Sequence, residues 1–350
     1  MIQDGNLTNQ SELQDILDEF PSDISLAFGY GSGVFAQSNH TVKESELPMI
    51  DLIFSTSNIK QWHDDNLKHN PDHYSVIPRT LGTGFVEMVN KWGAGVYFNP
   101  MVKVGSDRKR LVKYGVIHDE TLKRDLREWN TMYIAGRLHK PTLPLYTTND
   151  DEILELQEGY NLKYAMSTAL LLLSDKKDQI HRQQIDVTDI FESIASLSYI
   201  GDPRFAAGAE DPMKVKKLVH SVGQIDRFQT VYKHQYQSLE NMGIMSVNGS
   251  VVEMNLMDIS TRKSLYERLP PRLQSEMKYL FDKAAPDLGT DSSPDNIEEI
   301  SKILTKSIAN IVAPPAKIQS MKGLLTAGVL KSAKYASAKL SKGALKGMKW

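Results

Sequence analysis

Two strand-like stretches decide the fold: SLAFGYGSG at residues 25–33 and MIDLIF at residues 49–54. The first runs from a strand-like segment into the turn Gly31-Ser32-Gly33, and the second is apolar except for Asp51. An apolar run with one carboxylate is typical of a buried strand whose charged residue lies where the strand emerges. Glycines let a backbone approach phosphate oxygens, and a helix opening at such a turn offers unpaired N–H groups to an anion. The pattern therefore predicts a phosphate-binding turn close to a carboxylate.

A strand, a Gly-Ser turn and a second strand with an Asp form the core of nucleotidyltransferase-fold enzymes of the polymerase-β type. In that fold Gly31 and Ser32 would hold a triphosphate, and Asp51 would hold Mg²⁺, which bridges phosphate oxygens and screens their charge. The alternative interpretation is an ordinary tight turn followed by a strand-end Asp.

The second strand has a single carboxylate, whereas this fold usually has two carboxylates two residues apart. Positions 49 and 53, where the other would stand, are Met and Ile. A reduced carboxylate set is tolerable if the acceptor is a phosphate monoester, because that group is already anionic near neutral pH. Such a nucleophile needs positioning and charge screening more than it needs a base.

The order of the expected elements predicts a mixed α/β chain. Strands and helices alternate up to about residue 148, and beyond the polar stretch 147–151 the pattern is helical. Helices are expected at 11–20, 58–69, 82–92, 118–129 and 152–173, and further strands at 96–98, 102–104 and 111–117. A short strand pair is expected at 244–247 and 251–255, joined by Asn248-Gly249-Ser250. We expect an α/β domain at 1–148, a helical domain at 149–285, a linker and helix at 286–313, and a basic tail at 314–350.

The charges of this 350-residue chain are unevenly distributed. Residues 301–350 contain ten lysines and no acid, so the first 300 residues carry 31 basic against 43 acidic residues. This split predicts a tail directed to an anionic surface and argues against a body that binds nucleic acid. The absence of cysteine excludes disulfides, cysteine-ligated zinc and thiol catalysis.

Neither the hydropathy of the chain nor the charge pattern of its N-terminal residues indicates a membrane-spanning or targeting segment. The longest aliphatic run, at 169–173, is far shorter than the ~20 apolar residues of a membrane span. Residues 1–42 contain no Lys or Arg, unlike an Arg-rich presequence. We expect either that the protein is not imported by such a leader or that a leader has been removed.

Several further segments match one known family in order and spacing. They are YGSGVF at 30–35, MID at 49–51, Trp62-His63 with Asn66-Leu67, His73-Tyr74-Ser75, GAGVYFN at 93–99, KYGVI at 113–117, AGRL at 135–138 with Lys140-Pro141, LSY at 197–199 with Gly201-Asp202, Arg204, and Glu210-Asp211 with Lys214-Val215. Over about residues 27–235 the chain resembles the mitochondrial phosphatidate cytidylyltransferases.

The resemblance implies an enzyme that makes CDP-diacylglycerol and pyrophosphate from CTP and phosphatidate with Mg²⁺, for cardiolipin and phosphatidylglycerol synthesis. It implies a nucleotidyltransferase (polymerase-β-like) domain followed by a helical, winged-helix-like domain. It also implies a peripheral position on the matrix side of the mitochondrial inner membrane. Gly31, Ser32 and Gly33 would bind the nucleotide and Asp51 the metal. The acids that often follow this strand in relatives are Ser57 and Asn58 here, so these two are not expected to be ligands.

Three basic residues are candidates for the nucleotide site. Arg137 and Lys140 precede Pro141, and donors of this kind near a triphosphate would stabilise charge in the transition state. The alternative is a surface pair at a strand end. Lys113, in a strand beside Tyr114, is a further candidate nucleotide ligand.

Two pairs are candidates for substrate or domain-closure contacts. His73 and Tyr74 follow a turn and either line the site or close the loop. Asp202 and Arg204 flank Pro203. They either form an ion pair or reach a nucleotide or lipid phosphate if the helical domain closes over the site.

The tail has the pattern of a basic amphipathic helix. From Leu325 to Gly347, small and apolar residues fall within an arc of roughly 100° and lysines lie opposite them. Such a helix is expected in the interface of an anionic, cardiolipin-rich membrane, where each Lys adds about 1 kcal/mol. The residues expected to face the membrane are Lys331, Lys334, Lys342, Lys346 and Trp350. The alternatives are a solvated tail and a helix packed on the acidic body.

Two other functions share part of this pattern. A nucleotidyltransferase-fold enzyme with another acceptor, such as RNA, a sugar phosphate or a protein, would use the same Gly-Ser turn and Asp51. A non-catalytic membrane scaffold would need the tail but not Asp51.

Overall fold

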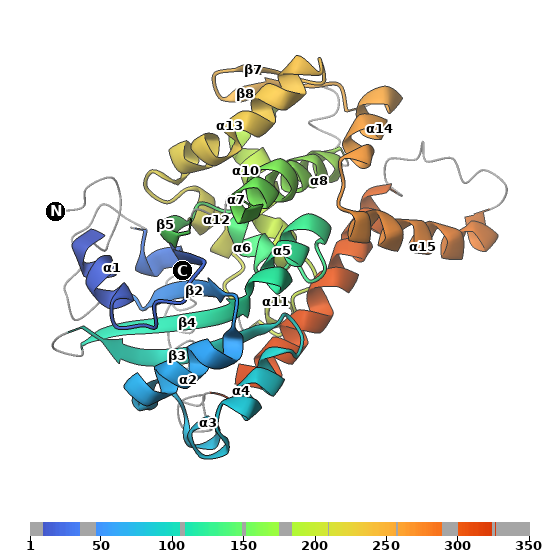
Figure 1. The fold of residues 1–350 in the computed structure, drawn as a ribbon. Helices are drawn as coiled ribbons and strands as arrows, with labels where there is room; N and C mark the ends of the chain where they lie inside the picture. Colours follow the sequence, from blue (N-terminus) through green and yellow to red (C-terminus); the bar gives the residue numbers. More distant parts are fainter. Residues whose placement is uncertain are drawn as a thin grey trace.

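The computed structural model describes residues 10–35, 47–105, 109–148, 152–174, 184–208, 210–256, 258–288, 300–323 and 326. Its first half is built on a five-stranded sheet with the order β3-β4-β2-β1-β5 (Figure 1). The strands are β1 Leu26–Tyr30, β2 Ile50–Thr56, β3 Val96–Val104, β4 Arg110–His118 and β5 Leu143–Thr147. β2 and β4 are parallel, and the other neighbouring pairs are antiparallel. The mixed α/β class expected from the sequence is confirmed.

The sheet separates two apolar cores because the central strand β2 buries alternate side chains on opposite faces. Leu52 and Phe54 belong to a core that also holds Trp62 and Tyr114. Ile53 belongs to the other core, which extends into the second half of the chain. Asp51 has the same parity as Ile53, so it lies on the face that meets the second half.

Short helices cover the first of these faces. They are α1 Gln10–Leu17, α2 Ile59–His69, α3 Val76–Leu81 and α4 Thr83–Asn90, with a 3₁₀ turn at Pro71–His73. Helices expected at 11–20, 58–69 and 82–92 are present as α1, α2 and α4. α3 is an additional helix.

β3 is one long strand where the sequence predicts two, at 96–98 and 102–104. Its register to β4 shifts between Asn99 and Val102, and Met101 has a φ of 55°. A bulge of this kind bends a strand without ending it.

The second half is mostly helical. α5 Asp119–Glu128 and α6 Ala135–Leu138 lead into it from the sheet. It consists of α7 Glu152–Leu156, a π-helical turn Gln157–Leu162, α8 Lys163–Leu173, α10 Val187–Ser196, α11 Pro203–Ala206, α12 Lys214–Val219, α13 Gln224–Asn241, α14 Ile259–Glu267 and α15 Pro271–Leu288. The helix expected over 152–173 is present as a continuous run of α7, the π-helical turn and α8.

A small antiparallel sheet accompanies these helices. Its order is β6-β8-β7, with β6 Gln184–Asp186, β7 Ser246–Asn248 and β8 Val251–Glu253. β7 and β8 form the expected hairpin, whose turn contains Gly249 at a φ of 62°.

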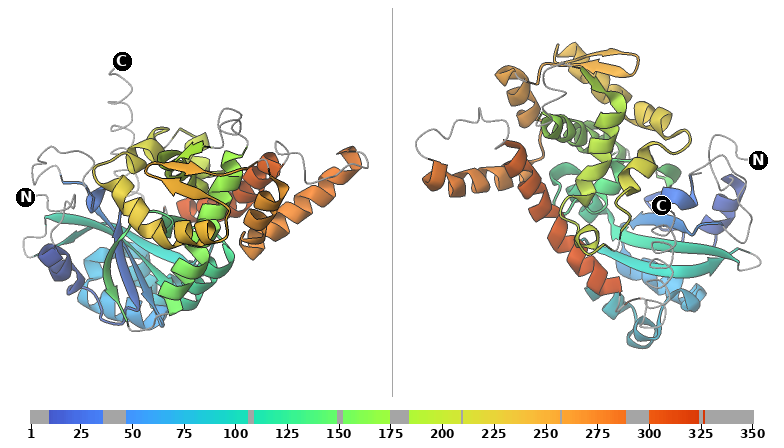
Figure 2. Two further views of the ribbon diagram at one scale, coloured as in Figure 1. Left: turned by 90° about the horizontal axis from the view of Figure 1, so that it is seen from above. Right: turned by 180° about the vertical axis from the view of Figure 1, so that it is seen from behind.

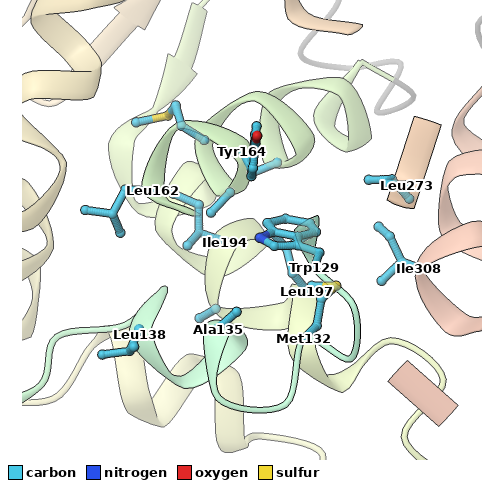
Figure 3. Close-up of a cluster of buried hydrophobic side chains, with 14 of the residues drawn as sticks. Trp129, Met132, Ala135, Leu138, Leu162, Tyr164, Ile194, Leu197, Leu273 and Ile308 are labelled. Atoms are coloured by element: carbon cyan, nitrogen blue, oxygen red, sulfur yellow. The ribbon is translucent and has the colours of Figure 1, made fainter. Parts of the chain in front are cut away.

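The two halves share one apolar core. Trp129, at the end of α5, is fully buried among side chains of α8, α10 and the last helices (Figure 3). Its indole Nε1 donates a hydrogen bond to Asn161 Oδ1 at 2.8 Å. The expected boundary at 148 therefore separates two parts of the chain that pack closely together.

The last described helix, residues 300–323, runs from the side of α15 to α3 and α4 (Figures 1 and 2). Its Gln319 and Lys322 side chains both donate hydrogen bonds to the carbonyl of Val96, on the edge strand β3, at 3.1 and 2.8 Å. The expected start of the tail at 314 falls inside this helix. Lys331, Lys334, Lys342, Lys346 and Trp350 lie outside the described residues. Among the described helices, none is long and apolar enough to cross a membrane.

Candidate active site

A cavity of about 400 Å³ opens where the end of β1 and the beginnings of β2 and β4 face the second half of the chain. The loop 129–134, α6, the segment around α11 and α12, and the helix 300–323 complete its wall. Eight of the expected site residues line it: Gly31, Ser32, Asp51, Lys113, Arg137, Lys140, Asp202 and Arg204.

The Gly-Ser turn and Asp51 are neighbours because β1 and β2 are antiparallel. Tyr30, the last residue of β1, is opposite Asp51 in the register. Gly31 has a φ of +75°, which favours glycine, and a Cβ on it would lie 3.9 Å from Asp51 Oδ2. The turn backbone and the carboxylate therefore face the same space.

Gly33, also expected to bind nucleotide, is not among the residues that line the cavity. A Cβ at this position would lie 2.2 Å from the carbonyl oxygen of Met49. Its glycine is required because the turn packs directly on the chain entering β2.

Lys113 projects from β4 beside Asp51. Its Nζ lies 3.1 Å from Asp51 Oδ1 and 4.7 Å from the centre of the Phe98 ring. Both charged side chains are only partly exposed, so the pair is less screened than a surface salt bridge. A bound anion and the carboxylate would compete for this lysine.

Arg137 is a fixed positive charge in the cavity wall. It lies on α6 and lines the cavity, so the alternative of a surface pair at a strand end is wrong. Its guanidinium donates to the carbonyl of Tyr133 and stacks 4.1 Å from the centre of the Tyr133 ring. Burial would lower the pKa of Arg137, but Tyr133 and Tyr30 outweigh it and raise the pKa above its usual value.

Tyr133 is a site residue that the sequence did not indicate. Burial would raise the pKa of its hydroxyl, but the charges of Arg137, Arg204 and Lys113 outweigh this effect and lower the pKa. The same three cations would act on a phosphate bound in the cavity.

Lys140 lies deeper in the wall. Its Nζ donates to the carbonyl of Gly136 and to Ser198 Oγ, the latter at 2.7 Å. Burial, followed by the charges of Arg137 and Lys214, lowers the pKa of Lys140 well below its usual value. The ammonium group is therefore poorly compensated until an anion enters.

Asp202 and Arg204 form the ion pair expected as one alternative, and both also line the cavity. Arg204 Nε lies 3.0 and 3.1 Å from the two carboxylate oxygens of Asp202, which also caps α11. Arg204 is further paired with Glu210, and Lys214 lies 2.9 Å from the same Glu210. Lys214 belongs to a segment matched by the resemblance, but it was not singled out as a ligand.

The lining is rich in charge and net positive. Six Lys or Arg residues and four Asp or Glu residues contribute to it. A low-dielectric cavity with excess positive charge attracts a multiply charged anion.

His73 and Tyr74 do not reach this cavity. His73 Nδ1 lies 3.2 Å from the hydroxyl of Tyr114, and the Tyr74 hydroxyl lies 2.7 Å from His63 Nδ1. These groups form a buried cluster on the opposite face of the sheet, where burial lowers the pKa of His63 to about 3. His73 and Tyr74 therefore close the loop after α2 and do not line the site.

The donors present fit a hard cation shared with a substrate. Asp51 contributes a carboxylate to the cavity lining. The described residues contain no group of three or more His, Asp or Glu side chains arranged for a metal. Mg²⁺ is commonly held by one or two carboxylates together with substrate phosphates and water, so a single carboxylate is compatible with it.

A Gly-Ser turn, a carboxylate opposite it and a wall of buried cations are typical of enzymes that transfer phosphate-containing groups. Comparison with known sequences is more specific. The chain belongs to the family described as "Phosphatidate cytidylyltransferase, mitochondrial", whose sequence profile matches residues 13–342. The resemblance inferred from the motifs is thereby confirmed.

Relatives of that name are similar over nearly the whole chain. The protein of Schizosaccharomyces pombe is 34% identical over 97% of this chain and 85% of its own length. The protein of Rattus norvegicus is 35% identical, with 94% of both chains covered. A solved nucleotidyltransferase-like protein from Exiguobacterium sibiricum covers 87% of this chain and 72% of its own, at 10% identity. Its TM-score of 0.21 is too low to bear on the fold.

Proposed function

We propose that this chain is a phosphatidate cytidylyltransferase, which forms CDP-diacylglycerol and pyrophosphate from CTP and phosphatidate. The observation that carries the proposal is the family match over residues 13–342. The cavity supports it, because both substrates are anionic phosphate compounds and the lining is net positive. The first half of the chain would be the nucleotidyltransferase (polymerase-β-like) domain, and the second the winged-helix-like domain.

In the proposed reaction, a phosphate oxygen of phosphatidate attacks the α-phosphorus of CTP. A new P–O bond forms, the bond between the α-phosphorus and its bridging oxygen breaks, and pyrophosphate leaves with the electron pair. Gly31, Ser32 and Lys113 would bind the triphosphate. Arg137 and Lys140 would stabilise the charge that develops on the phosphoryl oxygens.

Asp51 would hold Mg²⁺ together with the triphosphate. The bound metal would screen the negative charge between donor and acceptor. The acceptor needs no general base, because its phosphate monoester is already ionised near neutral pH. Catalysis would therefore depend on positioning and charge stabilisation.

Asp202 and Arg204 are proposed to contact substrate from the second half of the chain. Arg204 is held by Asp202 and Glu210 at the cavity wall, and the charges of Arg137 and Lys214 lie close by. Opposite sides of the cavity therefore present cations to one bound anion.

We further propose that the protein acts peripherally on the matrix side of the mitochondrial inner membrane. The relatives are named as mitochondrial, and phosphatidate is a membrane lipid. The lysines at 331, 334, 342 and 346 and Trp350 would bind its anionic, cardiolipin-rich surface.

The test is product formation from labelled CTP and Mg²⁺ on vesicles that contain phosphatidate, with ATP, GTP and UTP as parallel donors. We expect a lipid-extractable labelled product with CTP and none with ATP, GTP or UTP. A folded, vesicle-bound protein that makes no such product would contradict the proposed reaction. A product that forms only with another acceptor would contradict the proposed lipid substrate.

A further inference from the structure

Seven large apolar side chains are exposed on three neighbouring segments: α3, α4 with the turn that follows it, and the end of the helix 300–323. They are half of the fourteen such side chains found among the described residues. We call them the α3–α4 patch: Val76, Ile77, Leu81, Met88, Trp92, Ile318 and Met321. Val76, Leu81 and Met321 are 74%, 60% and 66% exposed. Exposed apolar side chains that are concentrated on neighbouring elements mark an interaction site.

The patch joins two segments that are far apart in the sequence. α3 and α4 follow each other directly, and the helix 300–323 ends beside them (Figure 2). A Cβ on Gly93 would lie 2.8 Å from Ile318 Cγ2, so the turn after α4 touches that helix. Lys322 Nζ fixes the contact by donating to the carbonyls of Asn90 and Trp92 at 3.2 and 3.0 Å.

Cations lie among and beside these apolar side chains. Arg79 is in the middle of α3, Lys91 follows α4, and Lys317 precedes Ile318; all three are exposed. Arg79 and Lys91 are paired with Asp72 and Glu87, at 3.9 and 2.8 Å. Residues 301–350 contain no Asp or Glu. Apolar side chains with basic neighbours and a partly exposed Trp are typical of a surface that enters the interface of an anionic bilayer.

The same helix also forms one wall of the cavity. Val312 and Ala316 line the cavity, and at 1.5 Å per residue Met321 lies about 7.5 Å beyond Ala316 along the helix axis. An enzyme acting on a diacyl lipid must bring its cavity to the bilayer, because the acyl chains are costly to transfer into water. A membrane-bound patch would hold this wall close to the lipid surface.

We propose that the α3–α4 patch inserts into an anionic lipid bilayer, as a membrane contact separate from the basic tail. That the binding partner of the patch is a lipid bilayer rests on the proposed function. The contact itself needs neither nucleotide nor turnover, so it is tested with phosphatidylglycerol vesicles that contain no phosphatidate. Failure of the contact and failure of the reaction are therefore distinguishable.

Trp92 provides a direct readout of insertion. Trp62 and Trp129 are fully buried and Trp92 is 42% exposed, while Trp350 lies in the tail. In the full-length Trp350→Phe protein, we expect vesicles with brominated acyl chains to quench the tryptophan fluorescence. The quenching should disappear when Trp92→Phe is added. Bound protein without quenching, or quenching that persists without Trp92, would overturn the proposal.

A second measurement tests the energetic contribution of the patch. The full-length double variant Val76→Ser/Leu81→Ser should partition about tenfold more weakly onto the same vesicles, since two exposed apolar contacts are lost. The control is Ile259→Ser on α14, which removes a side chain that is 59% exposed outside the patch. Circular dichroism and thermal unfolding establish that both variants fold. Unchanged partitioning would overturn the proposal, as would an effect confined to self-association in analytical ultracentrifugation.

Discussion

The side chain of Asp51 faces the Gly-Ser turn and is paired with Lys113, so a single carboxylate balances the cations at this end of the cavity. Replacing it with Asn keeps the shape but removes the charge that would hold a divalent cation. We expect Asp51→Asn to lower turnover by at least about a hundredfold. The measurement is the initial rate with CTP and phosphatidate, together with a thermal unfolding curve.

The matched control is Asp65→Asn, because Asp65 is a partly exposed carboxylate on α2. It accepts a hydrogen bond from Gln61 at 2.9 Å, and its ion pair with Lys68 spans 3.8 Å. This change should leave the rate almost unaltered, since surface pairs contribute little. More than about a tenth of the activity remaining in a folded Asp51→Asn protein would exclude the metal-binding role.

Lys140 is expected to couple nucleotide binding to proton uptake. Burial holds its pKa well below the usual value in the free protein, and an entering triphosphate would favour the charged form and raise that pKa. Between the two pKa values the complex binds more protons than the free protein, so affinity should fall as the pH rises.

Calorimetry in buffers with different ionisation enthalpies measures this proton uptake, with a non-reactive CTP analogue as ligand. Lys140→Met should reduce the uptake, and Lys217→Met should not. Lys217 lines the same cavity but is more exposed and is paired with Asp211. Equal proton uptake in both variants would show that another group is responsible.

Among the elements, the loop 129–134 depends on Asp125. This buried carboxylate accepts hydrogen bonds from the backbone N–H groups of Thr131, Met132, Ile134 and Ala135, and from the Thr131 hydroxyl, at 2.8–3.2 Å. The loop contains Met132 at a φ of 52°, carries Tyr133 and leads into α6 with Arg137. Asp125 is therefore a positioning residue for the cavity wall.

Asp125→Asn replaces an acceptor with a donor that faces other donors. We expect a loss of about 2–3 kcal/mol of stability. Below the unfolding temperature we expect kcat to fall about tenfold with little change in the KM for CTP, because Arg137 would be misplaced in the transition state. Glu120→Gln, an exposed change on the same helix, is the control. A variant that is less stable but has normal kcat would assign Asp125 a structural role alone.

The elements also show what could be predicted from the sequence. The Gly-Ser turn and Asp51 lie on adjacent antiparallel strands, so their proximity follows from local patterns. His73 and Tyr74 were open to two interpretations because pattern alone does not give the face of the sheet. Tyr114 faces α2, whereas its neighbour Lys113 faces the cavity.

Other parts depend on contacts that local patterns do not contain. α3 has the sequence VIPRTL, with no amphipathic repeat and an internal Pro, so it was not expected. Tyr133 lines the cavity because the Asp125 carboxylate holds the loop 129–134 in a conformation with Met132 at positive φ. The docking of the last helix joins residues more than 200 positions apart.

At the scale of the whole molecule, Lys322 connects the C-terminal helix to the sheet domain. The residue is 1% exposed, and burial lowers its pKa to about 7. The unfolded chain, with a lysine pKa of about 10.4, binds more protons between these two values. The free energy of unfolding should therefore rise with pH across this window, and the gain should be absent below about pH 7.

The variant Lys322→Met removes the titrating group and should flatten this rise. Lys317→Met, an exposed change on the same helix, should keep the slope of the wild-type protein. The measurement is the denaturant midpoint from pH 7 to pH 10. Equal slopes in both variants would contradict a buried Lys322 in the folded protein.

The C-terminal region has two physically different parts, which truncation should separate. Residues up to 323 form a helix that lines the cavity and bonds to β3, whereas the lysine-rich stretch lies after it. Removing residues 327–350 should preserve the unfolding midpoint and the activity on detergent-dispersed phosphatidate. It should weaken binding to anionic vesicles most strongly at low salt, because Lys contacts to the surface are screened by ions.

Removing residues 314–350 should instead lower both stability and activity in detergent, since Ala316, Gln319 and Lys322 are lost together with the tail. Vesicle co-sedimentation at two salt concentrations and the detergent assay distinguish the two truncations. Unchanged vesicle binding by the 327–350 deletion at low salt would contradict the membrane role of the tail. Normal activity of the 314–350 deletion in detergent would contradict the assignment of the docked helix to the cavity wall.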